Sequence, residues 1–190
     1  MLIDLVLKNR SYRAFDESRP ITEADMKALV DMARRTPSAI NKQPLRYRLV
    51  SSKAELEMLY ANTRYAGALS IKLPPEGQKP TGFIAIFADS EAGSVESLAL
   101  KDVGIAAQTI LLGATEMGFG GCMIGSFNPT RLSADLQVPE RYKPVLVIAL
   151  GTPAEQVVLE DATDTEHLIY YRDAENVHHV PKLKLEDVLL

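Results

Sequence analysis

The longest helix that the sequence predicts, from about Val95 to Met117, constrains the fold more than any other stretch. Its segment 103–113 is apolar on nearly every side, and such a helix is normally buried all round. Gly104 and Gly113 would let another helix approach closely. In a chain of 190 residues, this helix suggests that a second copy supplies part of its cover, so a bulky residue at Gly113 should disturb dimerisation. The alternative is the central helix of a monomeric core.

Composition excludes several classes of protein. With 46% hydrophobic and 24% charged residues, the chain 1–190 is expected to form a single globular domain. The formal net charge of -4 argues against a nucleic-acid binder, since such proteins usually present a basic face. The one cysteine, Cys122, excludes an intramolecular disulfide and a CxxC zinc site, and the three histidines are a poor ligand set for a metal. Segment 103–113 is too short to span a bilayer and no signal peptide is visible, so we expect a cytoplasmic protein without a membrane partner.

Two continuous apolar runs, 83–88 and 145–150, are typical of buried central strands. The alternation of residues 47–50 indicates a strand with one buried face. The proline-rich stretch 73–80 is expected to be a surface loop. The sequence does not show whether this loop acts as a lid over the substrate. The C-terminal extension 152–190 has little periodicity, so we expect it to wrap over the partner subunit.

Short polar residues mark the predicted helix ends. Thr22 with Asp25 resembles a capping box ahead of a second helix, and Ser52 offers a cap for a third. Asn128 begins a short helix, and Gly118 closes the longest one. These signals predict a chain in which helices alternate with the three strands.

The segment Arg10-Ser11-Tyr12-Arg13 places two guanidinium groups and a hydroxyl on consecutive residues. Arginine presents a planar fork of donors that matches a phosphate, and the serine hydroxyl adds a further donor. The segment therefore suits an anion. The alternative is that both arginines are solvated surface charges.

Two further segments suit the remainder of a flat ligand. Segment 36–44 holds amide and hydroxyl side chains between two prolines, and it could bind the edge of a hydrogen-bonding ring system. Segment 118–127 contains clustered glycines, which permit close approach of the backbone to a ligand. It is not a dinucleotide fingerprint, because it follows a helix, and it lacks the Gly-Lys-Ser/Thr ending of a P-loop.

Four blocks, in this order and spacing, resemble the nitroreductase family of FMN-dependent oxidoreductases. They are 10–13, 37–44, 120–126 and 145–155. The resemblance implies an α+β fold with a central mixed, mostly antiparallel sheet flanked by helices. It also implies an intertwined homodimer with two FMN sites at its interface.

The same resemblance assigns the cofactor-binding residues. The first block would hold the FMN phosphate and ribityl chain through Arg10, Ser11, Tyr12 and Arg13. The second block would reach the flavin from the other subunit through Pro37, Ser38, Asn41 and Gln43. The third would line the isoalloxazine with Met123, Ile124, Gly125 and Ser126. A basic residue near the C-terminus would complete the phosphate site, with Lys182 as first choice and Arg172 and Lys184 behind it.

Two positions depart from the family pattern. Many members have an aromatic residue where this chain has Leu45, and they often have Trp where it has Met123. Both changes would alter the pocket wall near the flavin, so the substrate preference is expected to differ.

No side chain is assigned a catalytic role, because the redox chemistry belongs to the cofactor. The leading hypothesis is a homodimeric reductase that transfers a hydride from NAD(P)H, through tightly bound FMN, to nitroaromatic or quinone-like acceptors by ping-pong turnover. One alternative keeps the fold with specialised flavin chemistry, either oxygen-dependent flavin fragmentation or reductive dehalogenation. Another is a flavin-binding protein without turnover. Neither the physiological acceptor nor a preference for NADH or NADPH follows from the sequence.

Three further side chains have ambiguous roles. Cys122 lies in an apolar stretch and is interpreted as a buried small side chain rather than a redox thiol. His178 and His179 are interpreted as surface or tail residues. The alternative is that one of them touches a ligand phosphate or the substrate.

Overall fold

Helices and strands alternate along most of the chain, in the computed structural model that describes residues 1–65, 67, 71–93 and 96–190. The helices are α1 (Leu2–Lys8), α2 (Glu23–Ala33), the 3-10 turn η1 (Ala39–Asn41), α3 (Lys53–Asn62), α4 (Glu96–Glu116), α5 (Pro129–Asp135) and α6 (Leu185–Val188). The strands are β1 (Phe15–Asp16), β2 (Leu45–Val50), β3 (Gly82–Asp89), β4 (Gly120–Ile124), β5 (Tyr142–Pro153), β6 (Val157–Asp161), β7 (Tyr171–Arg172) and β8 (His178–Lys182).

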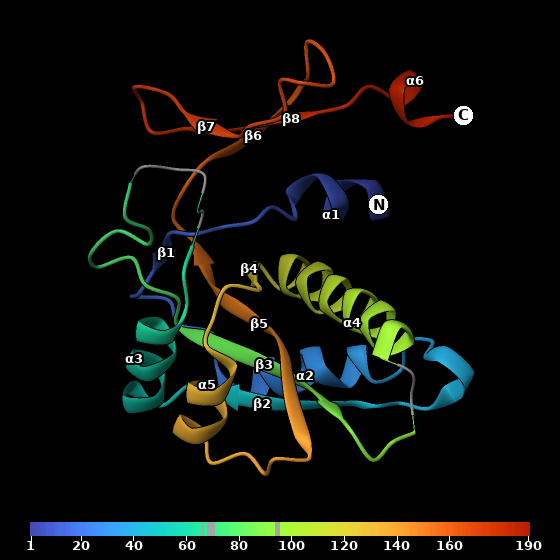
Figure 1. The fold of residues 1–190 in the computed structure, drawn as a ribbon. Helices are drawn as coiled ribbons and strands as arrows, with labels where there is room; N and C mark the ends of the chain where they lie inside the picture. The colour runs from blue at the N-terminus through green and yellow to red at the C-terminus, as the bar shows by residue number, and fades with distance from the viewer. Residues whose placement is uncertain (66, 68–70, 94–95) are drawn as a thin grey trace.

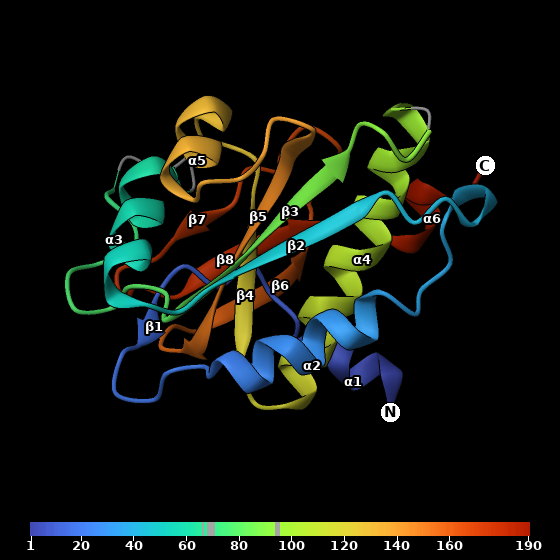
Figure 2. The same cartoon turned by 90° about the horizontal axis from the view of Figure 1, so that it is seen from below.

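The main sheet has the strand order β1-β5-β3-β2, and β4 also pairs with β5. Each of these pairs is antiparallel. Helices α2 and α4 lie on one side of the strands, and α3 and α5 lie on the other (Figure 1, Figure 2). A second, smaller sheet of order β6-β8-β7 has one parallel pair, β6 with β8. Separate helices and mostly antiparallel strands are the α+β fold that was expected.

Burial on both faces explains the continuous apolar runs of β3 and β5. Ile84 and Ile86 belong to the core under α2 and α4, whereas Phe83 and Phe87 belong to the core under α3 and α5. Successive side chains of a strand point to opposite faces, so a strand with two covered faces needs apolar residues throughout. The predicted strands are confirmed, and the stretch 73–80 contains neither helix nor strand.

The predicted helix ends are also confirmed. The Thr22 hydroxyl accepts a hydrogen bond from the Asp25 amide, while the Asp25 carboxylate accepts one from the Thr22 amide. At α3 the Ser52 hydroxyl accepts from the Glu55 amide, and at α5 the Asn128 side chain accepts from the Arg131 amide. Gly118 follows α4 with a φ of 83°, which is a left-handed conformation that glycine adopts without strain.

The expectation that α4 is buried on every side is wrong for the single chain. The predicted start at Val95 lies outside the described residues. One side of α4 packs against α2 and the sheet, but Leu100, Gly104 and Ile105 are exposed in the single chain. A Cβ at Gly104 would have open space, whereas one at Gly113 would lie 2.5 Å from Met32 Cε. The helix that approaches Gly113 closely is therefore α2 of the same chain, and the expectation that Gly113 reports on dimerisation is wrong.

Gly113→Val should therefore destabilise the fold and leave the oligomeric state unchanged. The added methyl groups would press on Met32 and Leu29 of α2, and such overpacking typically lowers the free energy of unfolding by about 1–3 kcal/mol. Urea denaturation measures this change. Glu116→Val, at an exposed position of the same helix, is the control and should change stability by no more than about 0.5 kcal/mol. Equal stability of the two variants would contradict the packing described for α2 and α4.

By length and composition, α4 is the one helix among the described residues that could cross a membrane. Half of its most apolar window is buried inside the chain, where Ala107, Ile110 and Ala114 join the core beneath α2. Such burial is the behaviour of a core helix, so the apolar composition of α4 is explained by packing.

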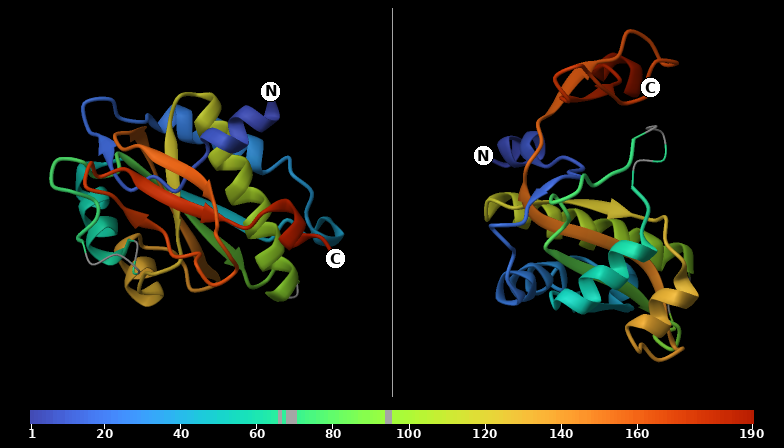
Figure 3. Two further views of the ribbon diagram at one scale, coloured as in Figure 1. Left: turned by 90° about the horizontal axis from the view of Figure 1, so that it is seen from above. Right: turned by 90° about the vertical axis from the view of Figure 1, so that its left-hand side faces the viewer.

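The C-terminal extension has more structure than its sequence pattern indicated. Residues 152 and 153 still belong to β5, and the chain then enters the small sheet of β6, β7 and β8. This sheet lies apart from the main sheet, with residues 1–14, here called the N-terminal segment, between them (Figure 1, Figure 3). We refer to the small sheet with its loops, residues 156–184, as the C-terminal sheet.

Candidate functional site

A cavity of about 400 Å³ lies between the N-terminal segment and the C-terminal sheet. The N-terminal segment contributes Asn9, Arg10, Ser11 and Arg13; α4 and β4 contribute Gln108, Leu111 and Met123; the C-terminal sheet contributes Val157, Tyr170, His178, Val180 and Lys182. Five of the residues predicted to bind the cofactor therefore meet in one place, although they come from distant parts of the sequence. We call this space the basic cavity.

The basic cavity has cationic walls without a carboxylate among its lining residues. Arg10, Arg13 and Lys182 line it together. The buried Nε atoms of Arg10 and Arg13 have no hydrogen-bond partner within the described part of the chain. Partial burial lowers the pKa of Arg10, as expected when a cation loses hydration. Buried donors without acceptors are costly, so this arrangement favours an anionic ligand that accepts hydrogen bonds.

Gly120 lets the N-terminal segment lie directly on β4, and Gly121 lets β4 lie close to β5. The Tyr12 amide donates to the Gly121 carbonyl at 3.0 Å, and Ser11 forms a bridge with Gly121. A Cβ at Gly120 would lie 2.5 Å from the Tyr12 ring, and one at Gly121 would lie 2.4 Å from the Ala149 carbonyl oxygen. These glycines therefore serve the packing of the chain itself. Tyr12 turns away from the basic cavity, because its ring covers Gly120 and its hydroxyl donates to the Lys8 carbonyl.

Glu155 holds the N-terminal segment to the C-terminal sheet. Its buried carboxylate accepts hydrogen bonds from the backbone amides of Arg13 and Ala14, and it forms an ion pair with Arg172. The Arg172 guanidinium also donates to the Asn176 carbonyl. Arg172 is thus engaged by Glu155, whereas Lys182 lines the basic cavity. This role of Glu155 was not predicted, although its position at the end of the fourth block was a signal in the sequence.

Side chains alternate between the two faces of β4, so the residues of the third block point in different directions. Met123 is partly exposed at the basic cavity, while its neighbours Cys122 and Ile124 face the core. Burial raises the pKa of the Cys122 thiol, which fits the interpretation of a buried small side chain. Gly125 is exposed, and Ser126 lines a different, polar cavity beside α5. Of the four predicted residues in this block, Met123 is the one at the basic cavity.

The second predicted block lines a separate cavity of about 330 Å³ under α2 and α4. Ser38 donates to the buried Asp102 carboxylate at 2.6 Å and accepts from the Gln43 amide at 2.9 Å. Pro37 and Gln43 also line this cavity, while the Asn41 side chain is exposed and accepts from the Gln43 side-chain amide. Among the described residues, none lines both cavities, so the second block and the basic residues lie apart in the single chain.

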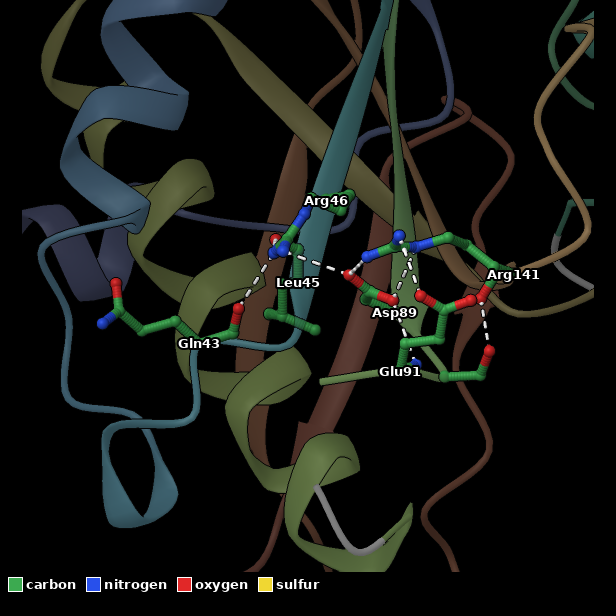
Figure 4. A network of polar contacts seen from close by, with 7 residues as sticks. Gln43, Leu45, Arg46, Asp89, Glu91 and Arg141 are labelled. Carbon is green, nitrogen blue, oxygen red and sulfur yellow. Dashed lines mark hydrogen bonds and ion pairs between the residues drawn. The ribbon is translucent and has the colours of Figure 1, made fainter. Parts of the chain in front are cut away.

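An ionic network holds the loop of the second block (Figure 4). Asp89, at the end of β3, is buried and paired with Arg46 at 3.1 Å and Arg141 at 2.7 Å. Arg46 also donates to the backbone carbonyls of Gln43 and Leu45. The network ties the loop to β2, to β3 and to Arg141, which directly precedes β5. It supports the left-handed backbone of Gln43, whose φ is 47°.

Stability should depend on pH through Asp89. Hydrogen bonds from Arg141 hold the pKa of Asp89 below its ordinary value. A carboxyl group with a lowered folded pKa stabilises the fold above its unfolded pKa of about 3.9, and this contribution is lost as the pH falls through the folded value. The Asp89→Asn variant should be less stable than wild type at pH 7 and show a shallower loss of stability below pH 4. Thermal unfolding between pH 7 and pH 3 measures both, and parallel curves would contradict the assignment.

Comparison with known proteins adds independent findings. A family model described as "Nitroreductase family" matches residues 6–152. The oxygen-insensitive NADPH nitroreductase of Helicobacter pylori (strain J99) is 24% identical over 178 residues, which cover 77% of this chain and 85% of that protein. The putative NAD(P)H nitroreductase YodC of Bacillus subtilis (strain 168) is 25% identical over an alignment of 189 residues, which covers 81% of this chain and 92% of that protein. A crystal structure from Exiguobacterium sibiricum 255-15, in complex with FMN, shares the fold with a TM-score of 0.72 at 16% identity, covering 90% of this chain and 97% of that one.

Proposed function

Because the chain belongs to the nitroreductase family, we propose that it is an FMN-dependent oxidoreductase. It takes a hydride from NADH or NADPH and passes electrons to a nitroaromatic or quinone-like acceptor. The NADPH nitroreductase of H. pylori and the FMN-bound structure from E. sibiricum support the choice of cofactors. The observation that carries the proposal is the basic cavity, which Arg10 and Arg13 line and where the buried Nε of each has no hydrogen-bond partner within the described residues.

The residues of the basic cavity fit the phosphate end of FMN. Arg10, Arg13 and Lys182 would bind the phosphate, since cationic donors make the strongest hydrogen bonds to such an anion. Ser11 and Gln108 offer neutral polar groups for the ribityl chain. When bound, FMN supplies the two-electron redox chemistry, so the chain needs no nucleophile or general acid of its own. These residues orient the cofactor and hold it tightly.

A homodimer completes the proposed site. Segment 36–44 lies at the second cavity, away from the basic residues, so a second copy is needed to bring its polar side chains to the flavin. Helix α1 buries none of its residues, and the exposed side of α4 presents Leu100, Gly104 and Ile105. Uncovered apolar side chains of this kind mark an interaction surface. The C-terminal sheet would then wrap over the partner subunit.

Gly104→Arg should convert the dimer to monomers, because a charged side chain at this open position would meet the partner chain. Sedimentation velocity measures the change in mass. Ala134→Arg, at an exposed position of α5, is the control and should leave the dimer intact. A dimer that survives Gly104→Arg, or a wild-type chain that sediments as a monomer, would overturn the proposed interface.

The proposed function is tested by incubating the purified chain with FMN and recording its absorbance after gel filtration. We expect about one FMN per chain and loss of the flavin absorbance when NADH or NADPH is added without oxygen. Oxidation of NAD(P)H is then followed with a nitroaromatic, with a quinone, and with oxygen alone. A chain that retains no flavin, or a flavin that neither nicotinamide reduces, would contradict the proposal. Since NADH and NADPH are cytoplasmic, we place the protein there.

A further inference from the structure

His178 is the most deeply buried histidine of the chain, with 1% of its surface exposed. It lies on β8 and lines the basic cavity together with Arg10 and Arg13. Neither of its ring nitrogens has a hydrogen-bond partner within the described residues. The Tyr170 ring packs beside it with 5.3 Å between the ring centroids, and the Arg13 guanidinium carbon lies 5.3 Å from the centroid of the same tyrosine ring. The expectation that this histidine is a surface residue is therefore wrong.

The surroundings keep the His178 ring uncharged. Burial, together with the charges of Arg13 and Arg172, lowers the pKa of His178 to about 4. A neutral imidazole has one N–H donor and one bare nitrogen that accepts. A buried ring with both nitrogens unsatisfied is unusual in a folded protein. The ring N–H therefore has no acceptor and the bare nitrogen has no donor within the described residues.

The neighbouring His179 shows that the lack of partners is specific. Its two ring nitrogens lie 3.1 Å from the Glu160 carboxylate and 3.0 Å from the Asp173 carboxylate. These hydrogen bonds raise the pKa of His179. Because side chains alternate along a strand, His179 points away from the basic cavity and His178 points into it.

We propose that His178 is a further binding residue for the phosphorylated cofactor, contacting the junction of its ribityl chain and phosphate. The ring N–H donates to a phosphate oxygen, and the bare nitrogen accepts from a ribityl hydroxyl. A sugar-alcohol phosphate offers both partners, whereas a phosphate dianion alone only accepts. This inference rests on the proposed function and adds to it a neutral contact beside the cationic Arg10, Arg13 and Lys182.

The first experiment titrates FMN and riboflavin into the full-length chain and follows flavin fluorescence. His178→Phe keeps a ring beside Tyr170 but removes both nitrogens, so FMN binding should weaken about tenfold or more, the size of a lost hydrogen bond to a charged group. The preference for FMN over riboflavin should fall as well. His178→Gln restores a donor and an acceptor and should recover part of the affinity. His179→Phe is the matched control on the same strand and should keep the FMN preference.

Unchanged FMN affinity in His178→Phe would overturn the proposal, and so would an equal loss in His179→Phe. Nitrogen-detected NMR of the wild-type rings provides a test without substitution, since the chain has only three histidines. FMN should shift the ring nitrogens of His178 and leave those of His167 in place. Bound FMN without a shift at His178 would contradict the contact. If the chain binds no flavin, the proposed function fails, and titration with glycerol 3-phosphate then tests His178 alone: a shift supports it, and none overturns it.

Discussion

Arg10→Ala and Arg13→Ala should each weaken FMN binding by about 2 kcal/mol or more, roughly 30-fold, because each removes charge-assisted hydrogen bonds to the phosphate. Both side chains line the basic cavity, and both have a buried Nε without a partner among the described residues. Each single variant would therefore remove one of the three cations, Arg10, Arg13 and Lys182, that line the cavity. The double variant should lose more than either single one, although neighbouring residues need not contribute additively.

Equilibrium titration of the flavin-free protein with FMN measures these losses. Arg35→Ala, which removes an exposed guanidinium from the end of α2, is the control and should bind FMN as the wild type does. Riboflavin affinity should change little in the arginine variants, because riboflavin carries no phosphate. Stoichiometric FMN retained by the double variant would show that the phosphate site lies elsewhere.

Glu155→Ala should lower the free energy of unfolding by about 3–5 kcal/mol, the scale for removing one partner of a buried ion pair. The Glu155 and Arg172 side chains are 2% and 8% exposed. Loss of the carboxylate would leave the Arg172 cation buried without its counter-charge, and it would also free the amides of Arg13 and Ala14. Since these contacts join the N-terminal segment to the C-terminal sheet, FMN affinity should fall together with stability.

Urea denaturation followed by circular dichroism measures the stability of this variant. Glu155→Gln keeps acceptors for the two amides and should fall between the wild type and Glu155→Ala. Glu140→Ala, at an exposed position before β5, is the control and should change stability by less than about 0.5 kcal/mol. If the Glu155→Ala and Glu140→Ala curves coincide, the carboxylate does not hold these segments together.

Local sequence patterns were sufficient to predict most of the main sheet and its helices. The runs 83–88 and 145–150 are apolar because both faces of β3 and β5 are covered, and the capping box at Thr22 is formed by residues close in sequence. Strand β4 was not predicted, because Gly120 and Gly121 have low strand propensity. Glycine is required at these two positions because Tyr12 lies against Gly120 and the Ala149 carbonyl lies against Gly121, and both contacts come from distant parts of the sequence.

The site was predictable only where a few consecutive residues carry its chemistry. Arg10 and Arg13 follow this rule, and the structure brings them to Lys182. The ion pair of Glu155 with Arg172 and the position of His178 depend on the pairing of β8 with β6 and β7, which no local periodicity encodes. Ser38 is a further case, because its bond to Asp102 joins residues 64 positions apart.

The central claim is that the basic cavity binds the phosphate of FMN. Calorimetric titration of the flavin-free, full-length chain with FMN and with riboflavin tests it most directly, since the two ligands differ only in that group. The account predicts that FMN binds at least about 100-fold more tightly, as expected for several charge-assisted hydrogen bonds to one anion. Equal affinities for the two flavins would contradict it.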